Sequence, residues 1–428
     1  MIYALFLEWK FCERLDGLRR RDIFQAKIEG VAFGGGGVAK VPRGDGQGGI
    51  TAFVPFTVDG DIVQAEVRSV KKRHLTGRLK KIVAPSPHRV NPPCRYFARC
   101  GGCCYQHIDY PHQLEIKHDQ VVQALKRIGG VPAPYVRPVI ASPSPYSYRG
   151  KAEFHFFGDS DGGKAGFFDI SGANIIEIER CEILDEGINS SLAEARGSLR
   201  EGGRPREERL VLWSREFEPL PAPCCRLPGE LNEPENKNNE RITRVVKDTA
   251  FLVPRSGFFQ NNKFLTGKMV DIVLEAARCS AGDSVLDLYC GSGLFSIFLA
   301  AAGARVLGIE AEADAVECAR QNALNLGLGN AQFHVGQVED QLKALTAGVF
   351  SVIVLDPPRA GCDKNVLSGI IDLKPDRVVY ISCDPATQAR DLRDLLSGGF
   401  SLAFVQPMDM FPQTMHIETV ALLERYGK

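Results

Sequence analysis

The chain has 428 residues, of which 44% are hydrophobic and 24% are charged. These proportions exclude a disordered or fibrous chain, and a length of about 150 residues per domain predicts two to four domains. The 52 basic residues balance the 52 acidic ones, which argues against an electrostatic grip of the whole protein on nucleic acid.

The start of the chain predicts neither an export signal nor a membrane segment. The apolar run 1–7 is short, Glu8 interrupts it, and the basic residues follow it instead of preceding it. The longest later apolar run, 294–304, is well below the ~18 residues of a membrane helix. Thirteen cysteines in such a chain indicate metal binding or catalysis in a reducing compartment. We therefore expect a cytoplasmic protein without membrane contacts. We also expect it to be a monomer.

Short segments that favour β-strands, separated by turns, occupy residues 22–84. Apolar residues flank the glycine run 34–37, and further strand-like segments lie at 53–56 and 62–67. Several short strands with glycine turns predict a small β-barrel. Residues 1–21 before it are an unassigned extension.

Basic side chains concentrate at the end of this domain. Residues 68–89 contain eight lysines and arginines and no acid, namely Arg68, Lys71, Lys72, Arg73, Arg78, Lys80, Lys81 and Arg89. A solvated strand and loop would explain this charge, and so would a patch that contacts nucleic-acid phosphates. On the second interpretation, Lys71, Lys72 and Arg73 are candidate contacts.

Cys94, Cys100 and Cys103 have the close spacing of a metal or cluster site. Prolines before the first cysteine and glycines between the other two allow the tight backbone that such a site needs. Cys104 is a poorer ligand because adjacent side chains diverge, so Cys181 is the best-placed fourth thiolate. Zinc and iron–sulfur clusters both accept four thiolates, and the spacing alone does not choose between them.

The middle of the chain predicts a helix, strands and an exposed excursion. Apolar residues on one face indicate a helix at 110–128. Further on, Tyr148-Arg149-Gly150-Lys151 is either a plain basic turn or a grip on backbone phosphate through Arg149 and Lys151. Residues 196–243 are polar and rich in Pro, Glu, Asn and Arg, which predicts an exposed excursion.

From residue 258 onward, apolar strands alternate with helices. The expected strands are 284–288, 305–309, 352–355 and 378–381, with helices that begin near 294 and 386. Near-continuous runs of Val, Ile and Leu alternating with helices predict a doubly wound parallel sheet.

A glycine loop follows the first of these strands. Gly291 and Gly293, between a strand and a helix, let a ligand approach the backbone closely. The third glycine of the dinucleotide fingerprint is absent because position 296 is Ser, which weakens a nicotinamide interpretation. Glu310 ends the next strand, where a carboxylate suits the hydroxyls of a ribose. The alternative for Glu310 is a solvated loop acid.

Two more carboxylates are expected at the same edge of the sheet. Asp356 ends another strand and therefore reaches the carboxyl edge together with Asp287 and Glu310. Such an acidic site suits the cationic sulfonium and the ribose of S-adenosylmethionine better than a pyrophosphate.

A cysteine and a glutamate complete this edge. Cys383 follows a buried strand and precedes a helix. Because a helix N-terminus lowers the pKa of a thiol, we interpret Cys383 as a reactive thiol instead of a small core residue. Glu418 lies in a last apolar strand that begins at His416. It either faces a polar site or is an exposed edge acid.

These motifs together resemble the RNA 5-methyluridine methyltransferase family over most of the chain. The matching pieces are Cys94-x5-Cys100-Gly-Gly-Cys103-x2-Gln106-His107, Cys181, Phe259-Gln260-x-Asn262, Asp287-Leu-Tyr289-Cys-Gly-Ser-Gly293, Asp356-Pro-Pro-Arg-Ala-Gly361, Ile381-Ser-Cys383-Asp-Pro and His416-Ile-Glu418-Thr. Residues 22–84 also resemble the TRAM domain of this family, an RNA-binding barrel. That domain and the cysteines are more similar to the bacterial ribosomal-RNA branch than to the tRNA branch.

The resemblance implies a fold class with three domains. Residues 22–84 would form an OB-like β-barrel of the TRAM type. Residues 85–257 would form an α+β central domain that carries an iron–sulfur cluster and binds RNA. Residues 258–428 would form a doubly wound, Rossmann-like methyltransferase domain of the α/β class.

The resemblance also implies the roles of single residues. Cys94, Cys100, Cys103 and Cys181 would hold a 4Fe-4S cluster. S-adenosylmethionine would be bound by Gln260, Tyr289, Gly291, Gly293, Glu310, Gln337 and Asp356. Cys383 matches the nucleophile of the family and Glu418 its proton acceptor. Leu294 departs from the family pattern, which often has a polar cofactor contact there.

The function expected from these roles is methylation of carbon 5 of a uridine in 23S ribosomal RNA. The Cys383 thiolate would add to carbon 6 of uracil, so that carbon 5 can attack the methyl group, and Glu418 would then remove the carbon-5 proton. The target base must leave its stack to reach such a site. Formation of 5-methyluridine in tRNA is an alternative. A nicotinamide-dependent oxidoreductase and a noncatalytic RNA-binding protein with a zinc site are less favoured, because neither gives Cys383 and Glu418 a task.

Overall fold

The computed structural model describes residues 18–42, 49–159, 162–200, 209–214 and 241–427. The chain divides into two compact units, Met1–Pro92 with Cys104–His112, and Pro93–Cys103 with Gln113–Lys428. Within the described ranges, no helix is both long enough and apolar enough to cross a membrane.

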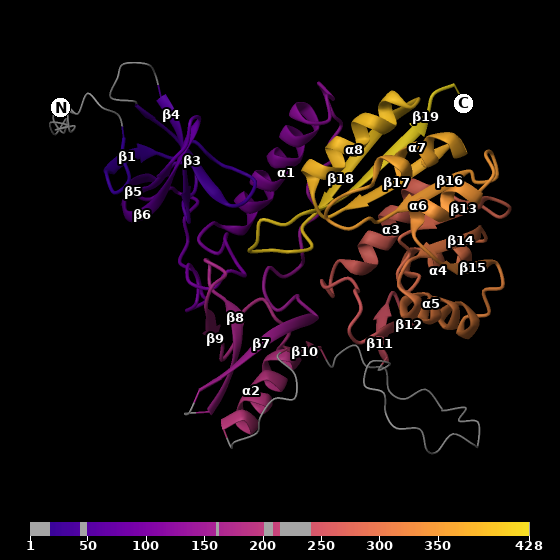
Figure 1. Ribbon diagram of the computed structural model, residues 1–428, viewed down its shortest axis with the longest axis horizontal. Helices are drawn as coiled ribbons and strands as arrows, with labels where there is room; N and C mark the ends of the chain where they lie inside the picture. Colours follow the sequence, from indigo (N-terminus) through magenta and orange to yellow (C-terminus); the bar gives the residue numbers. More distant parts are fainter. Residues whose placement is uncertain (1–17, 43–48, 160–161, 201–208, 215–240, 428) are drawn as a thin grey trace. The chain divides into compact units, whose positions relative to one another are not determined.

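A six-stranded sheet forms the first unit (Figure 1). Its strands are β1 (Ile23–Lys27), β2 (Gly30–Val31), β3 (Gly36–Pro42), β4 (Gly49–Pro55), β5 (Ile62–Val70) and β6 (His74–Ala84). They follow the order β1-β5-β6-β4-β3-β2, in which β4 and β6 are parallel and the other neighbours antiparallel. The edge strand β1 also contacts β3, near the opposite edge, so the sheet curls. These strands confirm the β domain, and closure into an OB-like barrel stays a prediction.

Helix α1 (Tyr110–Arg127) confirms the helix expected at 110–128, and most of it belongs to the second unit. A four-stranded antiparallel sheet follows in the order β10-β7-β8-β9 and packs against α2 (Glu186–Arg200). Its strands are β7 (Lys151–Asp159), β8 (Gly162–Phe168), β9 (Ile175–Glu177) and β10 (Arg209–Trp213). A two-stranded ribbon of β11 (Arg241–Val246) and β12 (Thr249–Pro254) leads to the C-terminal part.

The exposed excursion expected at 196–243 is wrong in part. Strand β10 lies within it and pairs with β7. Trp213 of β10 is only 9% exposed, and its indole N–H donates to the carbonyl of Arg255 at 3.0 Å. The strand is short and has polar residues on both sides, so the composition of the whole segment gave no indication of it. Residues 201–208 and 215–240 lie outside the described residues.

The C-terminal part is a seven-stranded sheet in the order β15-β14-β13-β16-β17-β19-β18. Its strands are β13 (Ser284–Leu288), β14 (Arg305–Glu310), β15 (Ala331–Val335), β16 (Val352–Leu355), β17 (Arg377–Ser382), β18 (Phe400–Met408) and β19 (Glu418–Arg425). The first five in the order are parallel, whereas β19 is antiparallel to both of its neighbours. The four strands expected from the sequence are confirmed, and the last strand begins at Glu418, two residues later than expected.

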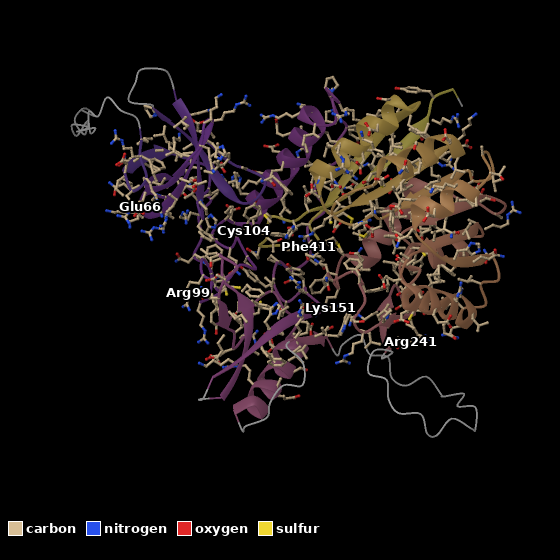
Figure 2. All side chains as sticks on the ribbon, in the orientation of Figure 1. Glu66, Arg99, Cys104, Lys151, Arg241 and Phe411 are labelled. Carbon is tan, nitrogen blue, oxygen red and sulfur yellow. The ribbon has the colours of Figure 1, made fainter. Side chains whose placement is uncertain are left out.

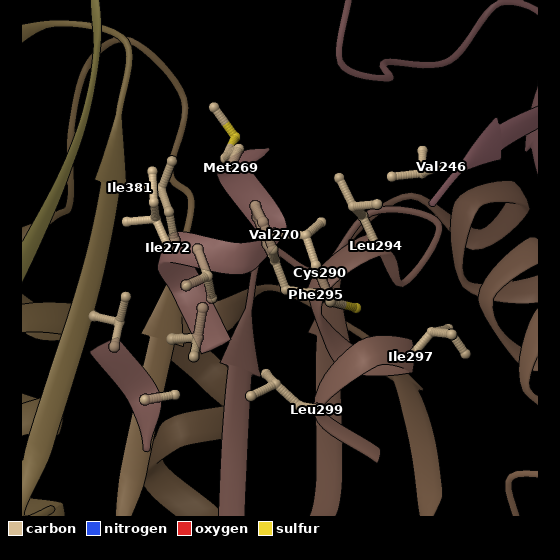
Figure 3. Close-up of a cluster of buried hydrophobic side chains, with 14 of the residues drawn as sticks. Val246, Met269, Val270, Ile272, Cys290, Leu294, Phe295, Ile297, Leu299 and Ile381 are labelled. Atoms are coloured by element: carbon tan, nitrogen blue, oxygen red, sulfur yellow. The ribbon is translucent and has the colours of Figure 1, made fainter. Parts of the chain in front are cut away.

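Helices cover both faces of this sheet, as a doubly wound fold requires (Figure 1). They are α3 (Thr266–Ala277), α4 (Leu294–Ala301), α5 (Ala313–Asn325), α6 (Val338–Gln341), α7 (Lys364–Leu373) and α8 (Pro385–Ser397). Successive strand residues point to opposite faces, so Val354 belongs to one hydrophobic cluster and Leu355 to the other. Figure 3 shows the first cluster, where residues of α3 and α4 such as Ile272 and Leu299 gather. The carboxyl ends of the five parallel strands therefore lie at one edge of the sheet.

Candidate active site

The loop between β13 and α4 runs from Tyr289 to Gly293. The φ angles of Tyr289, Gly291 and Gly293 are 63°, 54° and 84°, in the left-handed region that favours glycine. A Cβ on Gly293 would lie 3.2 Å from the Cβ of Ala319 and 3.3 Å from the ring of Phe333, whereas a Cβ on Gly291 would meet nothing within 4 Å. A side chain at position 293 would therefore be crowded, whereas Gly291 leaves open space in which a ligand can lie against the backbone.

Asp287, at the end of β13, is buried below this loop. It is 1% exposed, and its Oδ2 accepts a hydrogen bond from the Ser296 hydroxyl at 2.5 Å. Burial raises the pKa of Asp287 to about 7, the nearby Glu310 adds to the rise, and the bond from Ser296 opposes it. Sequence reasoning treated Ser296 only as a missing glycine, but the structure shows that this hydroxyl holds the aspartate.

Glu310 closes the loop from the neighbouring strand β14. One of its carboxylate oxygens accepts the N–H of Gly291 at 3.1 Å, and the other accepts the N–H groups of Ala311 and Glu312 at 2.7 and 3.0 Å. These bonds fix the carboxylate at the edge of the loop, where the ribose of a cofactor was expected. Gln337 directly precedes α6 and is exposed.

Gln260 and Asn262 come from the segment before α3. Gln260 is 7% exposed, and its Oε1 is buried without a hydrogen-bond partner among the described residues. Such an acceptor costs about 1–3 kcal/mol when it stays unsatisfied, so it is suited to a donor on a ligand. Asn262 is fully buried, and its amide donates to the carbonyl of Met410 and the hydroxyl of Ser142, both at 3.2 Å. Asn262 is therefore structural.

Cys383 lies at the junction of β17 and α8. The first free N–H groups of α8, on Ala386 and Thr387, donate to Oδ1 of Asp384 at 2.8 and 3.1 Å. This cap satisfies the helix end and places a negative charge on it. The expectation that the helix lowers the pKa of Cys383 is therefore wrong, because burial raises this pKa to about 11 and Glu418 adds to the rise.

Arg359 and His416 stand beside this cysteine. Arg359 hydrogen-bonds Cys383 and acts against the rise of its pKa. The Nη2 of Arg359 also lies 3.4 Å from Nε2 of His416. Burial and the charge of Arg359 lower the pKa of His416 to about 4, so this ring is neutral at pH 7. Both residues lay inside recognised motifs, yet sequence reasoning assigned them no role because it could not see their side chains converge.

The strand β19 brings Glu418 to Cys383. Ser382 and Thr419 pair across the antiparallel strands β17 and β19. Cys383 follows Ser382 and Glu418 precedes Thr419, so the cysteine and the glutamate lie opposite each other just past this pair. Glu418 is 4% exposed, and burial raises its pKa well above the usual 4.5, with a further rise from Asp356. Burial also raises the pKa of Asp356 to about 7. The acids expected at the carboxyl edge therefore lie together.

The basic stretch of the first unit is partly neutralised. Arg78 and Lys80 lie 2.9 and 3.2 Å from the carboxylate of Glu66, which is labelled in Figure 2. Arg89 holds the buried carboxylate of Asp61. Lys71, Lys72 and Arg73, between β5 and β6, are exposed. Arg68 and Lys81 are exposed as well, and contact of Lys71, Lys72 and Arg73 with RNA stays a prediction.

The second basic segment is built into the fold beside Gln260. Arg149 forms an antiparallel bridge with Asn262, and the N–H of Gly150 donates to the carbonyl of Asn261 at 2.8 Å. Lys151, labelled in Figure 2, donates to the carbonyl of Gly257. Its ammonium also lies 4.6 Å from the centre of the Trp213 ring. The contact of Arg149 and Lys151 with RNA stays a prediction.

The four cysteines of the predicted cluster are all half-buried. Cys94, Cys100 and Cys181 pack against one hydrophobic cluster of the second unit. Burial raises the pKa of Cys181 to about 12, and Cys94 and Cys100 are near enough to add to this rise. Cys103 and Cys94 likewise both affect the phenol of Tyr146, whose pKa burial raises to about 12. Among the described residues, no group of three or more His, Cys, Asp or Glu side chains has an arrangement that could hold a metal ion.

Comparisons with known proteins agree on one family. The family described as tRNA (Uracil-5-)-methyltransferase matches residues 236–426, and the TRAM domain matches residues 18–80. A protein of Halalkalibacterium halodurans described as an uncharacterized RNA methyltransferase is 36% identical over 455 residues, which cover 95% of this chain and 98% of that protein. One of Gloeobacter violaceus with the same description is 37% identical over 93% of this chain and 95% of its own length.

A solved structure covers nearly the same extent. The tRNA (uracil-54, C5)-methyltransferase of Pyrococcus abyssi, in complex with S-adenosyl-L-homocysteine, superposes with a TM-score of 0.68 at 26% identity, over 94% of this chain and 100% of that one. Together with the relatives, this likeness covers the β domain, the central sheet and the C-terminal fold. The chain belongs to the family of RNA (uracil-5-)-methyltransferases that carry a TRAM domain.

Proposed function

We propose that the protein transfers a methyl group from S-adenosylmethionine to carbon 5 of a uridine in RNA, with Cys383 as nucleophile and Glu418 as base. The observation that carries this proposal is the pairing of Ser382 with Thr419. It sets a thiol and a carboxyl opposite each other at the strand edge where open α/β sheets bind ligands. Arg359 and Asp356 stand beside them.

The chemistry needs both groups because carbon 5 of uracil is a weak nucleophile. The thiolate of Cys383 adds to carbon 6, and the electron pair of the 5,6 double bond moves into an enolate. Carbon 5 of the enolate then takes the methyl group, and the electron pair of the broken sulfur–methyl bond would stay on sulfur, so that S-adenosylhomocysteine leaves. Glu418, as carboxylate, accepts the proton from carbon 5, and the electron pair of that C–H bond restores the double bond and expels the thiolate. Once Glu418 has released this proton to solvent, the enzyme is unchanged, and RNA has exchanged a proton for a methyl group.

The residues of the glycine loop fit S-adenosylmethionine. The open space beside Gly291 gives it room, and the buried Oε1 of Gln260 offers an acceptor for a donor group. Burial disfavours the ionised forms of Asp287 and Asp356, and a cation bound nearby would favour them. Tyr289, Gly293, Glu310 and Gln337 complete the proposed site, in which the cofactor supplies the methyl group on a sulfonium.

We propose that Cys94, Cys100, Cys103 and Cys181 hold a 4Fe-4S cluster. All four thiols are half-buried, Cys94, Cys100 and Cys181 pack against one small hydrophobic cluster, and Cys103 and Cys94 both lie near Tyr146. The N–H of Gly102 donates to Sγ of Cys100 at 3.4 Å, as backbone amides do around iron–sulfur clusters. The metal would keep the thiols deprotonated, against the effect of burial. The side chains would have to close further around it than the described arrangement does.

We propose ribosomal RNA as the substrate, with tRNA as the alternative. The exposed Lys71, Lys72 and Arg73, and Arg149 and Lys151 beside Gln260, would contact phosphates. The β domain cannot choose between the two RNAs by itself, because a tRNA enzyme aligns over 94% of this chain. The four cysteines are the feature that favours ribosomal RNA. An RNA substrate and an iron–sulfur cluster both fit a cytoplasmic protein.

The test is to map 5-methyluridine in ribosomal and transfer RNA from cells with and without the gene, and to repeat the reaction with purified protein. We expect one or more uridines of 23S RNA to lose the modification without the protein and to regain it in vitro. Cys383→Ala should abolish transfer while RNA binding survives. Glu418→Gln should leave an enzyme–RNA adduct that survives denaturation, because elimination waits for proton removal. Full activity of Cys383→Ala would refute the mechanism.

A further inference from the structure

The loop 409–417 connects β18 to β19 and ends at the proposed base. Met408, the last residue of β18, pairs with Glu418, the first residue of β19. Asp409 is the first residue of the loop and directly follows Met408, which lies opposite Glu418 in the neighbouring strand. Phe411, labelled in Figure 2, lies within it. Both ends of the loop therefore adjoin Glu418, one along the chain and the other across the strand pair.

A buried ion pair holds the start of the loop. The ammonium of Lys117, on α1, donates to Oδ1 of Asp409 at 2.6 Å and to the carbonyl of Phe411 at 3.1 Å. Both charged side chains of the pair are fully buried. Removing two charges from water costs as much as a pair usually returns, and apolar replacements are often equally stable. The Lys117–Asp409 pair is therefore weakly explained by stability alone, which points to another role for it.

Neutral hydrogen bonds hold the middle of the same loop. The amide of Gln113, one turn before Lys117 on α1, donates to Oε1 of Gln413 at 3.0 Å, and its Oε1 accepts the N–H of Gln413 at 3.1 Å. The hydroxyl of Tyr148 donates to the carbonyl of Pro412 at 3.0 Å. The glutamine pair and the tyrosine are buried. Side chains from outside the sheet thus fix the loop at successive residues.

We infer that Lys117 and Gln113 are positioning residues for Glu418: through the loop 409–417, helix α1 holds the base at the place where it removes the proton from carbon 5. This inference rests on the proposed function. It assigns α1 to one chemical step, the removal of the proton, and leaves addition of Cys383 and methyl transfer to the residues of the sheet edge.

The experiment compares Lys117→Met with Lys126→Met, which changes an exposed lysine in the last turn of the same helix. The substrate is the RNA that the mapping experiment identifies. In Lys117→Met we expect turnover to fall by about tenfold or more, since small misplacements of catalytic groups have such effects, and a denaturation-resistant enzyme–RNA adduct to accumulate. Lys126→Met should behave as wild type. Wild-type turnover in Lys117→Met would overturn the inference.

The same RNA containing 5-fluorouridine separates the steps, because carbon 5 then carries no proton to remove. Lys117→Met should trap this RNA at the wild-type rate, and a failure to trap it would show that the pair serves an earlier step or the fold. The double variant Lys117→Met/Asp409→Leu replaces both charges. Lys117→Met alone leaves the buried carboxylate of Asp409 without its cation and should lower the melting temperature. The double variant should have the melting temperature of wild type but the slow turnover of Lys117→Met. Wild-type turnover in the double variant would also overturn the inference. If wild type itself traps no 5-fluorouridine RNA, the proposed function fails instead.

Discussion

The hydroxyl of Thr419 lies 3.2 Å from the carbonyl oxygen of Ser382 and 2.9 Å from Oε1 of Gln388. It therefore joins the end of β17, the start of β19 and helix α8 at one point. The amide of Gln388 in turn donates to the carbonyl of Tyr380 at 3.0 Å. Because Cys383 and Glu418 directly follow and precede the Ser382–Thr419 pair, this contact sets the spacing between the proposed nucleophile and base.

Replacing Thr419 by Val should loosen that spacing while it preserves the shape of the side chain. The buried acceptor on Gln388 would lose its donor, at a cost of about 1–3 kcal/mol in the free energy of unfolding. We expect kcat to fall about tenfold with an unchanged KM for RNA, since binding surfaces stay intact. Ser368→Ala, which removes an exposed hydroxyl of α7, is the control. A rise in KM alone would contradict this role for Thr419.

The reactivity of Cys383 should rise steeply with pH in the protein without cofactor. Its pKa of about 11 means that the thiolate fraction grows about tenfold per pH unit between pH 7 and 10. Alkylation of Cys383 by iodoacetamide, followed by mass spectrometry of its peptide, measures this fraction. Arg359→Gln should shift the profile to higher pH because it removes the cation that favours the thiolate, and Arg359→Lys should restore part of it. A plateau below pH 8 would contradict the assignment.

Asp287 should make the protein less stable as pH rises. Its folded-state pKa of about 7 exceeds the unfolded value of ~3.9, so its contribution is complete below pH ~4 and is lost as pH rises toward 7. The loss is on the order of 4 kcal/mol. Asp287→Asn keeps an acceptor for Ser296 without the charge, so it should be more stable than wild type at pH 8. The stability of Asp287→Asn would still fall with rising pH to some extent, because the pKa of Asp356 is also raised.

Urea unfolding at pH 5 and pH 8 measures this difference. Asp372→Asn, at an exposed position in α7, should leave the pH dependence unchanged. Saturating S-adenosylmethionine should reduce the loss of stability at pH 8, because a cation near Asp287 favours the ionised form. If the free energy of unfolding changed equally between pH 5 and pH 8 in wild type and Asp287→Asn, this aspartate would not be the source of the pH dependence.

The strands of the C-terminal sheet could be predicted because their apolar runs are continuous. Ser284–Leu288 and Val352–Leu355 were placed to the residue, since buried parallel strands carry no competing pattern. The strand Arg209–Trp213 was missed because it is short and its polar surroundings dominate the composition. Periodicity within a window cannot reveal a partner strand more than fifty residues away.

The candidate site could be predicted as a set of residues but not as an electrostatic environment. The sequence places Cys383 before a helix, and the dipole then indicates a low pKa. It does not show that Asp384 occupies the N–H groups of that helix, or that Glu418 is buried beside the thiol. Arg359, which acts in the opposite direction, comes from another strand end. The pKa of Cys383 depends on the distances from its thiol to Glu418 and Arg359, and these distances are known only once the fold is known.

The four cysteines should make the anaerobically purified protein brown. A 4Fe-4S cluster gives a broad absorbance near the blue edge of the visible, with about four iron and four sulfide per chain. Cys181→Ser should lose most of this iron, because Cys181 is the ligand from a distant part of the chain. The matched control is Cys104→Ser, which follows Cys103 directly but belongs to the first unit, where its Sγ lies beside Gly35. Cys104→Ser should keep the colour. A colourless protein that contains zinc would refute the cluster and leave the methyl transfer untouched.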